Sequence, residues 1–472
     1  MIYNSFSFLI FFPFLFILYY IIPVKRKKCR NGYLLLVSYL LYLSFKPVYA
    51  LFLLGLTLVT FYFSIWIEKR KNNKRLLVIG VLLALFPLSF FKYYSFVNCI
   101  VLDILLAIGI RFQLPGLNWA IPVGISYITF QALGYMLDVY NKRINAEKDF
   151  FTYALFVSFF PSVVAGPINK ASLIIPQLKA LRPYFDYEKA VAGLKMLLWG
   201  MFMKVVVADR VALYVDTVMP NYMNYTGVTC LAACFLYSIQ IYADFAGYSL
   251  MAIGVGKIMG IDLTENFRRP FFAISITDFW HRWHMSLSTW LKDYIYIPLG
   301  GSRCSRIRNY LNIIITFLVS GIWHGASWTF VIWGLFNGVI QIVEKLLGVQ
   351  KYDGKKHSIR FVRTLYTFIL FNIALVFIRM PSIEDSISFF SRILDTSLPV
   401  TLYLSALPNP PLIIFGCLSL FMKDFIDEYY PHKFLLMNNS SIIVRWSTYV
   451  VLIVAILSLG VFSSDQFIYA SF

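Results

Sequence analysis

Charged residues are scarce in this sequence: they make up 14% of its 472 positions. Soluble domains typically carry about 25% charged residues. The six cysteines follow no regular spacing, so we expect no disulfide framework. Histidine occurs only five times, and His281 with His284 would supply too few ligands for zinc. We therefore expect neither a cross-linked secreted fold nor a metal site.

Several motifs of nucleotide binding and nucleophilic catalysis are also absent. The sequence has no Walker A loop and no G-x-S-x-G nucleophile elbow. Gly254 and Gly256 are followed by Gly260, which comes one residue too late for the dinucleotide fingerprint. The H-x-x-x-x-D box of soluble acyltransferases is missing as well. Any nucleophilic chemistry would therefore proceed without a Ser–His pair of these types.

Apolar sequence, by contrast, is abundant, at 59% of all residues. A soluble protein of this length would bury only about three quarters of its surface, so lipid must cover part of this one. Aromatic residues, at 18%, fit belts at both membrane interfaces. The composition predicts an all-α integral membrane protein with no large soluble domain.

We expect about ten to twelve transmembrane helices, each from an apolar run long enough to cross or nearly cross the bilayer. The runs lie near residues 6–23, 33–45, 48–67, 76–98, 119–139, 151–168, 190–208, 227–245, 310–343, 364–380, 411–422 and 443–463. The segment 264–309 mixes Pro, Arg, Asp, His and Trp with apolar residues, which indicates re-entrant or interfacial helices. No internal repeat is visible, so a single membrane-embedded domain over residues 1–472 is the simplest organisation.

The net charge of +19 is concentrated in short patches between the apolar runs. These patches are residues 25–30, 69–75, 303–308 and 351–363. They follow the positive-inside pattern of cytoplasmic loops, and the first run is read as a retained span with its N-terminus outside. No patch is interleaved with aromatic residues, so we expect no nucleic-acid binding. A basic inner face would, however, attract an anionic substrate such as a phosphorylated cofactor.

Three of the histidines lie in apolar, Trp-rich settings. His281 and His284 belong to the segment 278–288, and His324 is flanked by Gly321 and Gly325. Ionisable groups inside a membrane protein are costly and usually functional. An unperturbed pKa of about 6.5 suits histidine to general-base work near neutral pH. The two glycines would allow close approach of the backbone, either to a substrate or to a neighbouring helix.

Five sequence motifs occur in a characteristic order. They are Ser158-Phe159-Phe160-Pro161, Ala165-Gly166-Pro167, the segment from Tyr242 to Ser249, the segment from Phe279 to Gly301, and Trp323-His324-Gly325. Over roughly residues 120–345 this order resembles the membrane-bound O-acyltransferase family. Within it, the chain is most similar to the bacterial branch that acetylates alginate and other exported or wall polysaccharides, for which Pro298-Leu299-Gly300-Gly301-Ser302-Arg303 is characteristic. Leu250 departs from that branch and is similar to the teichoic-acid D-alanylation branch, which keeps D-alanyl transfer as an alternative.

The resemblance implies an activity and a site. His324 matches the catalytic histidine of the family, and His284 matches a second polar position in the same central tunnel. Asp244 and Asp278 fall in matching motifs and would position helices or support the residues that contact the substrate. A thioester donor, acetyl-CoA or another acyl thioester, would enter from the cytoplasm, with no bound cofactor, and the acyl group would leave on an oxygen outside. The location implied is the bacterial cytoplasmic membrane.

The last residues, Phe467 to Phe472, read F-x-Y-x-x-F within a tail, 463–472, that the charge pattern places outside. The pattern resembles the end of a small separate partner in teichoic-acid D-alanylation, whose tyrosine carries the acyl group. Tyr469 would then be an acyl relay, and a separate extracytoplasmic SGNH-type transferase would pass the group to a polysaccharide. Alternatively, the aromatic tail would simply anchor the chain at the membrane interface.

Two further interpretations remain open. An acyltransferase of the same family acting on lipid or protein would have the same motifs. A lipid or sugar transporter would be expected to show related halves and paired broken helices, and the sequence shows neither.

Overall fold

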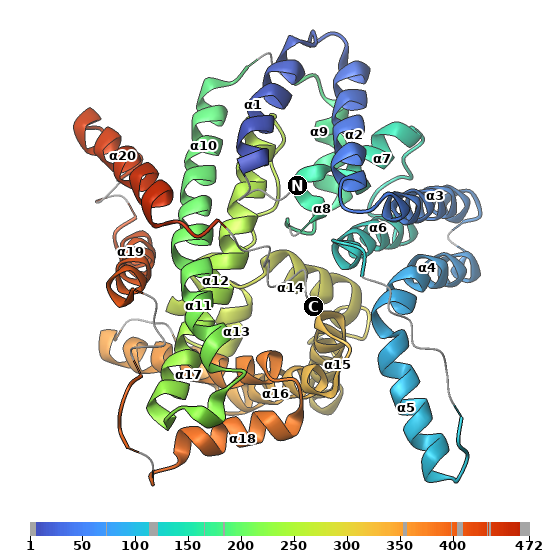
Figure 1. The fold of residues 1–472 in the computed structure, drawn as a ribbon. Coiled ribbons are helices and arrows are strands. Elements are labelled where there is room, and N and C mark those ends of the chain that lie inside the picture. The colour runs from blue at the N-terminus through green and yellow to red at the C-terminus, as the bar shows by residue number, and fades with distance from the viewer. Residues whose placement is uncertain are drawn as a thin grey trace.

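The computed structural model describes residues 6–71, 73–112, 121–164, 166–182, 185–352, 356–397, 399–403, 409–431, 433 and 436–462. All regular secondary structure within these ranges is helical (Figure 1).

The helices differ widely in length. The N-terminal ones are α1 (Phe6–Ile21), α2 (Lys27–Leu43), α3 (Pro47–Lys69), α4 (Lys74–Leu88), α5 (Tyr94–Ala107), α6 (Ile125–Tyr140), α7 (Phe150–Ser158), α8 (Phe160–Val163) and α9 (Ala171–Lys179). The others are α10 (Tyr187–Met201), α11 (Asp209–Val218), α12 (Gly227–Ile258), α13 (Ile276–Trp280), α14 (Met285–Leu291), α15 (Arg306–His324), α16 (Trp328–Leu346), α17 (His357–Arg379), α18 (Ile383–Leu394), α19 (Pro410–Tyr429) and α20 (Ile442–Leu459). The π-helical segments are η1 (Ser89–Tyr93), η2 (Phe202–Ala208) and η5 (Lys292–Tyr296), and the 3-10 turns are η3 (Tyr222–Asn224), η4 (Pro270–Phe272) and η6 (Val349–Lys351).

Seven continuous helices in the described part are long and apolar enough to cross a membrane. They are Pro47–Lys69, Lys74–Ala107, Tyr187–Val218, Gly227–Ile258, Trp328–Leu346, His357–Arg379 and Ile442–Leu459. The predicted all-α, multi-span architecture is confirmed. The predicted change of character at 264–309 is also visible, because residues 264–305 form only the short helices α13 and α14 and the segments η4 and η5 before α15 begins at Arg306.

Two apolar runs fold differently from the single spans predicted for them. The run 310–343 is a hairpin of α15 and α16 that turns at residues 325–327. The run 151–168 is broken at Phe159 into α7 and α8. Pro161 lies in the first turn of α8, where proline is tolerated, whereas inside a continuous helix it would remove a hydrogen bond. Hydrophobicity alone does not reveal either break.

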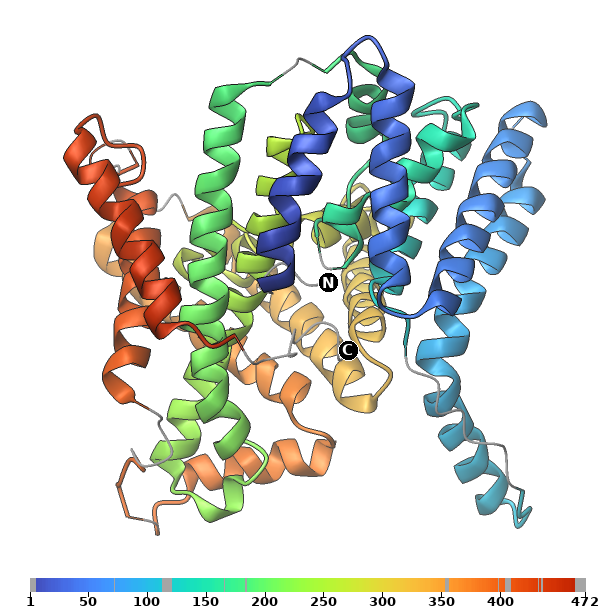
Figure 2. The same ribbon diagram turned by 45° about the horizontal axis from the view of Figure 1, so that its top comes forward.

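The tightest helix contact joins α10 to α12, which run side by side in both views (Figures 1 and 2). Gly193 faces Gly254, and Gly200 faces Gly247. A Cβ atom on any of the four would lie 2.5–2.8 Å from a carbonyl oxygen of the opposite glycine. Small residues allow membrane helices to pack this closely. These glycines therefore fix α12, the helix that carries Asp244 and Phe245, against α10.

Contacts connect basic residues of the first and last patches. Lys27 donates to the carbonyl oxygen of Lys179 on α9, and Arg360 pairs with Glu428, at the end of α19. The loop between α12 and α13 connects these two sites, because it contacts α9 and α10 through Asp262 and Glu428 through Arg269. We call this the basic end of the bundle. Helix α18 lies at the opposite end from the α1–α2 turn (Figures 1 and 2).

Candidate active site

His324 is the last residue of α15 and is only 4% exposed. Its position depends on the close contact between α15 and α16. A side chain at Gly321 would collide with the backbone carbonyl of Phe330, and one at Gly325 would overlap the Phe330 ring. The two glycines therefore serve helix packing, which decides between the alternatives left open by the sequence.

A buried lysine holds the end of α15. Lys92, in the π-helical segment η1, donates from its ammonium to the carbonyl oxygens of Trp323 at 2.6 Å and His324 at 3.0 Å. Its positive charge also complements the negative end of the helix dipole. Lys92 is not among the residues predicted from the sequence, although a lysine inside the apolar run 76–98 is a visible sign of a functional or structural role.

His284 is fully buried and has an unusual backbone conformation. Its φ of +43° lies in the left-handed region, which costs a non-glycine residue about 1 kcal/mol or more. The backbone N–H of Met285 donates to the carbonyl oxygen of Asn266 at 2.9 Å, and the N–H of Arg268 donates to that of Arg282 at 2.8 Å. These bonds hold the His284 turn against the α12–α13 loop.

The two histidines predicted from the sequence lie together. Their ring centroids are 6.5 Å apart, although the residues come from different elements. Phe245 on α12 contacts the His284 ring edge-to-face at 4.7 Å, and Trp333 contacts the His324 ring at 5.0 Å. The pair is therefore enclosed by aromatic rings, which exclude bulk water from the imidazole groups.

The His284 ring is held from its Nδ1 side. Nδ1 lies 3.1 Å from Oδ1 of Asn266, whose side chain is 1% exposed. Asn266 is not among the residues predicted from the sequence. Its contact with His284 could not be read from spacing, because the chain between the two residues passes through η4 and α13 and folds back.

The two aspartates of the sequence motifs hold helices. Asp244 forms an ion pair of 2.6 Å with Lys204, which also pairs with Asp209 at 2.7 Å. This buried cluster links α12 to η2 and α11. Asp278 pairs with Arg282 at 3.0 Å, and its carboxylate accepts from the backbone N–H of Ile274. The roles of Asp244 and Asp278 in catalysis stay a prediction.

A cavity of about 420 Å³ lies between the short helices of 276–296 and the α15–α16 hairpin. It is lined at one end by Ser320, one helical turn before His324, and by Trp280, which packs against Trp333 at 5.6 Å. Lys345 and Gln350, near the basic end of the bundle, line it as well. The cavity thus extends from that end toward the histidine pair.

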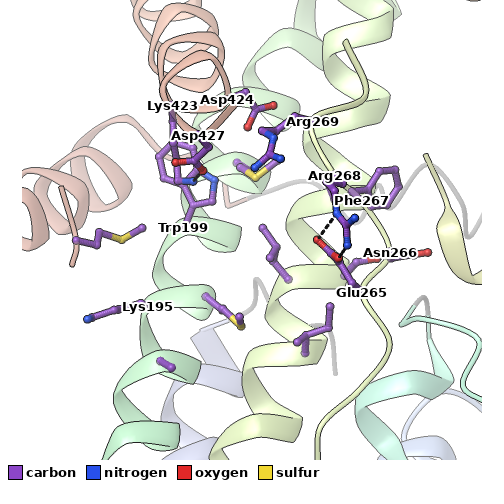
Figure 3. A pocket seen from close by; sticks show the side chains of 18 of the residues that line it. Lys195, Trp199, Glu265, Asn266, Phe267, Arg268, Arg269, Lys423, Asp424 and Asp427 are labelled. Atoms are coloured by element: carbon purple, nitrogen blue, oxygen red, sulfur yellow. Dashed lines mark hydrogen bonds and ion pairs between the residues drawn. The ribbon is translucent and has the colours of Figure 1, made fainter. Parts of the chain in front are cut away.

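A second cavity, of about 540 Å³, lies between α10, α12, α19 and the loop 263–269. Figure 3 shows Trp199 and Lys423 on one side of it and the loop residues from Glu265 to Arg269 on the other. Asn266 borders this cavity, as does Leu250, the position at which the sequence departs from the polysaccharide branch.

Tyr469 lies outside the described residues. The chain that leads to it is held at the end of α20, where Arg210 donates to the carbonyl oxygen of Leu459 and the N–H of Val461 donates to that of Val205 at 3.0 Å. Asp244, Lys204 and this anchor therefore all meet around η2.

Comparison with known proteins decides the family. Residues 140–373 match the model of the membrane-bound O-acyltransferase family. The chain is 35% identical over 386 residues to the probable alginate O-acetylase of Pseudomonas aeruginosa, an alignment covering 81% of this chain and 72% of that protein. This chain belongs to the membrane-bound O-acyltransferase family. The resemblance inferred from the motifs is confirmed, and the protein is an acyltransferase with several membrane spans.

Two other relatives of this acyltransferase are named for different acyl transfers. The chain is 33% identical over 407 residues to the peptidoglycan O-acetyltransferase of Helicobacter pylori, covering 80% of this chain and 76% of that protein. It is 28% identical over 226 residues to the teichoic acid D-alanyltransferase of Bacillus subtilis, covering 46% of this chain and 57% of that protein.

Proposed function

We propose that this acyltransferase lies in the bacterial cytoplasmic membrane and moves acetyl groups from a cytoplasmic thioester, such as acetyl-CoA, toward a polysaccharide outside. The observation that carries the proposal is the buried pair of His284 and His324, which a cavity approaches from the basic end of the bundle. The acetyl group and the polysaccharide acceptor are supported by two relatives named for the O-acetylation of alginate and of peptidoglycan.

In the proposed reaction His324 is the general base. It takes the proton of an attacking hydroxyl as the hydroxyl oxygen bonds to the acyl carbon. The carbon–sulfur bond then breaks, and the leaving thiolate takes the proton back from His324, so the products are an ester and a free thiol. His284, beside it, orients or polarises the reacting groups. The dry aromatic surroundings strengthen these polar interactions.

The 420 Å³ cavity is the proposed route of the thioester arm. Of the 420 Å³ and 540 Å³ cavities, it is the one whose lining includes Ser320, which lies one helical turn before His324 on α15. It also begins near the basic patches, which attract the phosphate groups of such donors.

Tyr469 is the proposed first acceptor. The last ten residues, 463–472, follow directly from the anchored end of α20. Its phenolic oxygen would receive the acetyl group from the thioester, and a separate SGNH-type transferase outside would take the group to the polysaccharide. The first step converts a thioester into an oxygen ester and releases the thiol, and the second step exchanges one oxygen ester for another.

D-alanyl transfer is the second candidate. Leu250 supports this candidate, because a leucine at this position resembles the D-alanylation branch and the residue borders the 540 Å³ cavity. Mass spectrometry of the acylated product distinguishes the two groups, and it also identifies a lipid or protein acceptor.

The first test replaces the base. His324→Ala should lower acyl transfer by about 10²–10⁴-fold, the usual contribution of a general base. His357→Ala is the matched control, because His357 is exposed at the start of α17. Both variants are compared by acetate release from the polysaccharide of cells that express them at equal levels. Wild-type acetylation with well-inserted His324→Ala would refute this proposal.

The second test concerns the relay. Tyr469→Phe should abolish polysaccharide acetylation, because it removes the accepting oxygen and keeps the aromatic ring. An interfacial anchor would tolerate this change. Mass spectrometry of the C-terminal peptide should find acetyl on Tyr469, accumulating when the outer transferase is deleted. Normal acetylation by Tyr469→Phe would instead show direct transfer to an outside acceptor.

A further inference from the structure

Asn266 makes side-chain contacts that determine the chemistry of His284. It lies in the loop that follows α12 and is 1% exposed, at the border of the 540 Å³ cavity. In Figure 3 its side-chain amide points away from Trp199 and α10. On the far side from the cavity the amide meets His284 and Ser286.

The orientation of the Asn266 amide is fixed by its neighbours. The backbone N–H of Ser286 lies 3.3 Å from one amide atom, and a backbone N–H can only donate, so that atom is Oδ1. The Ser286 hydroxyl oxygen accepts from the N–H of Ile168 at 3.1 Å and donates its own hydrogen to Oδ1 at 2.9 Å. On the other side, Nδ2 donates to the hydroxyl oxygen of Ser249 at 3.0 Å.

This orientation assigns the tautomer of His284. Because Oδ1 of Asn266 can only accept, Nδ1 of His284, 3.1 Å away, must carry a hydrogen. A neutral imidazole has a single N–H, so its other nitrogen, Nε2, has the lone pair. We propose that Asn266 is a positioning residue that holds His284 as the Nδ1–H tautomer, with Nε2 as a hydrogen-bond acceptor.

The tautomer selects between the two roles proposed for His284, and in that respect the inference rests on the proposed function. A neutral ring that accepts at Nε2 can orient a hydroxyl group of the acceptor. It cannot donate a hydrogen bond to the thioester carbonyl and so cannot polarise it. Polarisation of the carbonyl would require the opposite tautomer, which the Asn266 amide disfavours.

Several elements contribute groups that face the His284 ring. Titratable groups beside it are His324 on α15, at 6.5 Å between ring centroids, and Tyr127 on α6, at 6.2 Å. Helix α15 also contributes the Trp323 ring at 5.9 Å, α12 contributes the apolar ring of Phe245, and the α12–α13 loop contributes Asn266. Lys92 binds the backbone oxygen of His324.

The tautomer itself can be measured without substrate. Nitrogen-15 NMR of histidine-labelled protein in lipid, with His284→Ala to assign the signal, should show a protonated Nδ1 and an unprotonated Nε2. Finding Nε2 protonated and Nδ1 unprotonated in the wild-type protein would overturn the proposal. This result is independent of the proposed function, which would fail separately if both His284→Ala and His324→Ala transferred acyl groups normally.

Two variants test the consequence for activity. Asn266→Leu should lower kcat by at least about tenfold, as loss of an orienting partner does, and NMR should show Nε2–H gaining population. Ser249→Ala, which removes only the partner of Nδ2, is the matched control and should have a much smaller effect.

Asn266→Asp is a second variant that keeps the proposal testable if Asn266→Leu fails to fold. It keeps an acceptor at Oδ1 and so should keep the tautomer and part of the activity. Its carboxylate also favours the imidazolium form, so the acid limb of the pH–kcat profile should move up by about one unit or more. A merely structural role would leave that limb in place. An unshifted profile, or wild-type kcat in Asn266→Leu, would refute the role.

Discussion

The histidine motifs supply the imidazole rings, but residues distant in sequence hold them. Lys92 and His324 are separated by 232 positions and are joined by one hydrogen bond of 3.0 Å. Asn266 precedes His284 by 18 positions, and its Oδ1 atom contacts Nδ1 of the His284 ring. In both cases an isolated polar residue in an apolar or mixed segment makes the decisive contact.

Lys92 is the clearest test at this scale. Lys92→Met keeps the length and apolar character of the side chain but removes the donor to the carbonyls of Trp323 and His324. A buried polar group without its partner costs about 1–3 kcal/mol, so the end of α15 should loosen. We expect thermal stability to fall and acyl transfer to fall at least about tenfold as the base loses its position.

Lys92→Arg is the control for charge, since it keeps a cation and several donors at the same place. It should retain more activity than Lys92→Met. The comparison uses melting temperature and initial transfer rate of the purified protein. Equal, wild-type rates in both variants would show that the α15 terminus is held without Lys92.

These contacts explain which parts of the site could be predicted from the sequence. The Trp-rich apolar segments pointed to His281, His284 and His324, and the resemblance to the family selected His284 and His324. The structure brings the rings of these two together and leaves His281 exposed. Lys92 and Asn266 were missed because their roles depend on tertiary contacts, which no local spacing records. The position of Tyr469 stays a prediction.

At the scale of elements, apolar periodicity predicted the helices but not their breaks. The run 310–343 contains enough apolar residues for one long helix, yet Gly325 ends α15 and allows α16 to fold back. The same turn places His324 inside the molecule. The run 151–168 is broken at Phe159 before Pro161, so an apolar stretch of span length becomes two short buried helices. Such breaks follow from packing, which hydropathy does not measure.

The 420 Å³ and 540 Å³ cavities allow a matched test of the donor route. Thr316 on α15 and Ile253 on α12 are both partly buried, and each lines one cavity. Thr316→Trp should fill the 420 Å³ cavity and raise the KM for the thioester by about tenfold or more, because a filled site loses contacts worth at least about 1.4 kcal/mol. Ile253→Trp fills the other cavity and should change this KM little.

Steady-state kinetics with a short-chain acyl thioester measures both effects. A large rise of KM in Ile253→Trp with none in Thr316→Trp would move the donor route to the cavity bordered by Asn266 and Leu250. That result would leave the family and the base unchanged and would reassign only the path of the thioester.

At the scale of the whole molecule, Lys27 of the first basic patch and Arg360 of the last lie at the basic end of the bundle, connected through the loop between α12 and α13. The opposite end contains α18, whose Arg392 donates to the backbone carbonyls of Met223 and Tyr225. Charge asymmetry in the sequence predicts which end faces the cytoplasm, because basic loops tend to stay on the inner side of the membrane. In the proposed function, the same asymmetry would give the reaction its direction, from a basic inner face to an outer acceptor.

That direction can be tested with single cysteines at two exposed positions, in a chain whose six native cysteines are replaced by serine. Ile387→Cys on α18 should react with a membrane-impermeant maleimide added to intact cells, since Ile387 is 58% exposed at the end of the bundle opposite the α1–α2 turn. Ser358→Cys, exposed in the first turn of α17 within the basic patch 351–363, should react only after the cells are opened. The two residues are joined by α17, so their labelling patterns must be opposite if this helix crosses the membrane. Labelling of Ser358→Cys in intact cells would show that the chain has the opposite orientation, with the mouth of the 420 Å³ cavity outside. A cytoplasmic thioester could not then reach Ser320 and His324 by that route, and the proposed direction of transfer would fail with it.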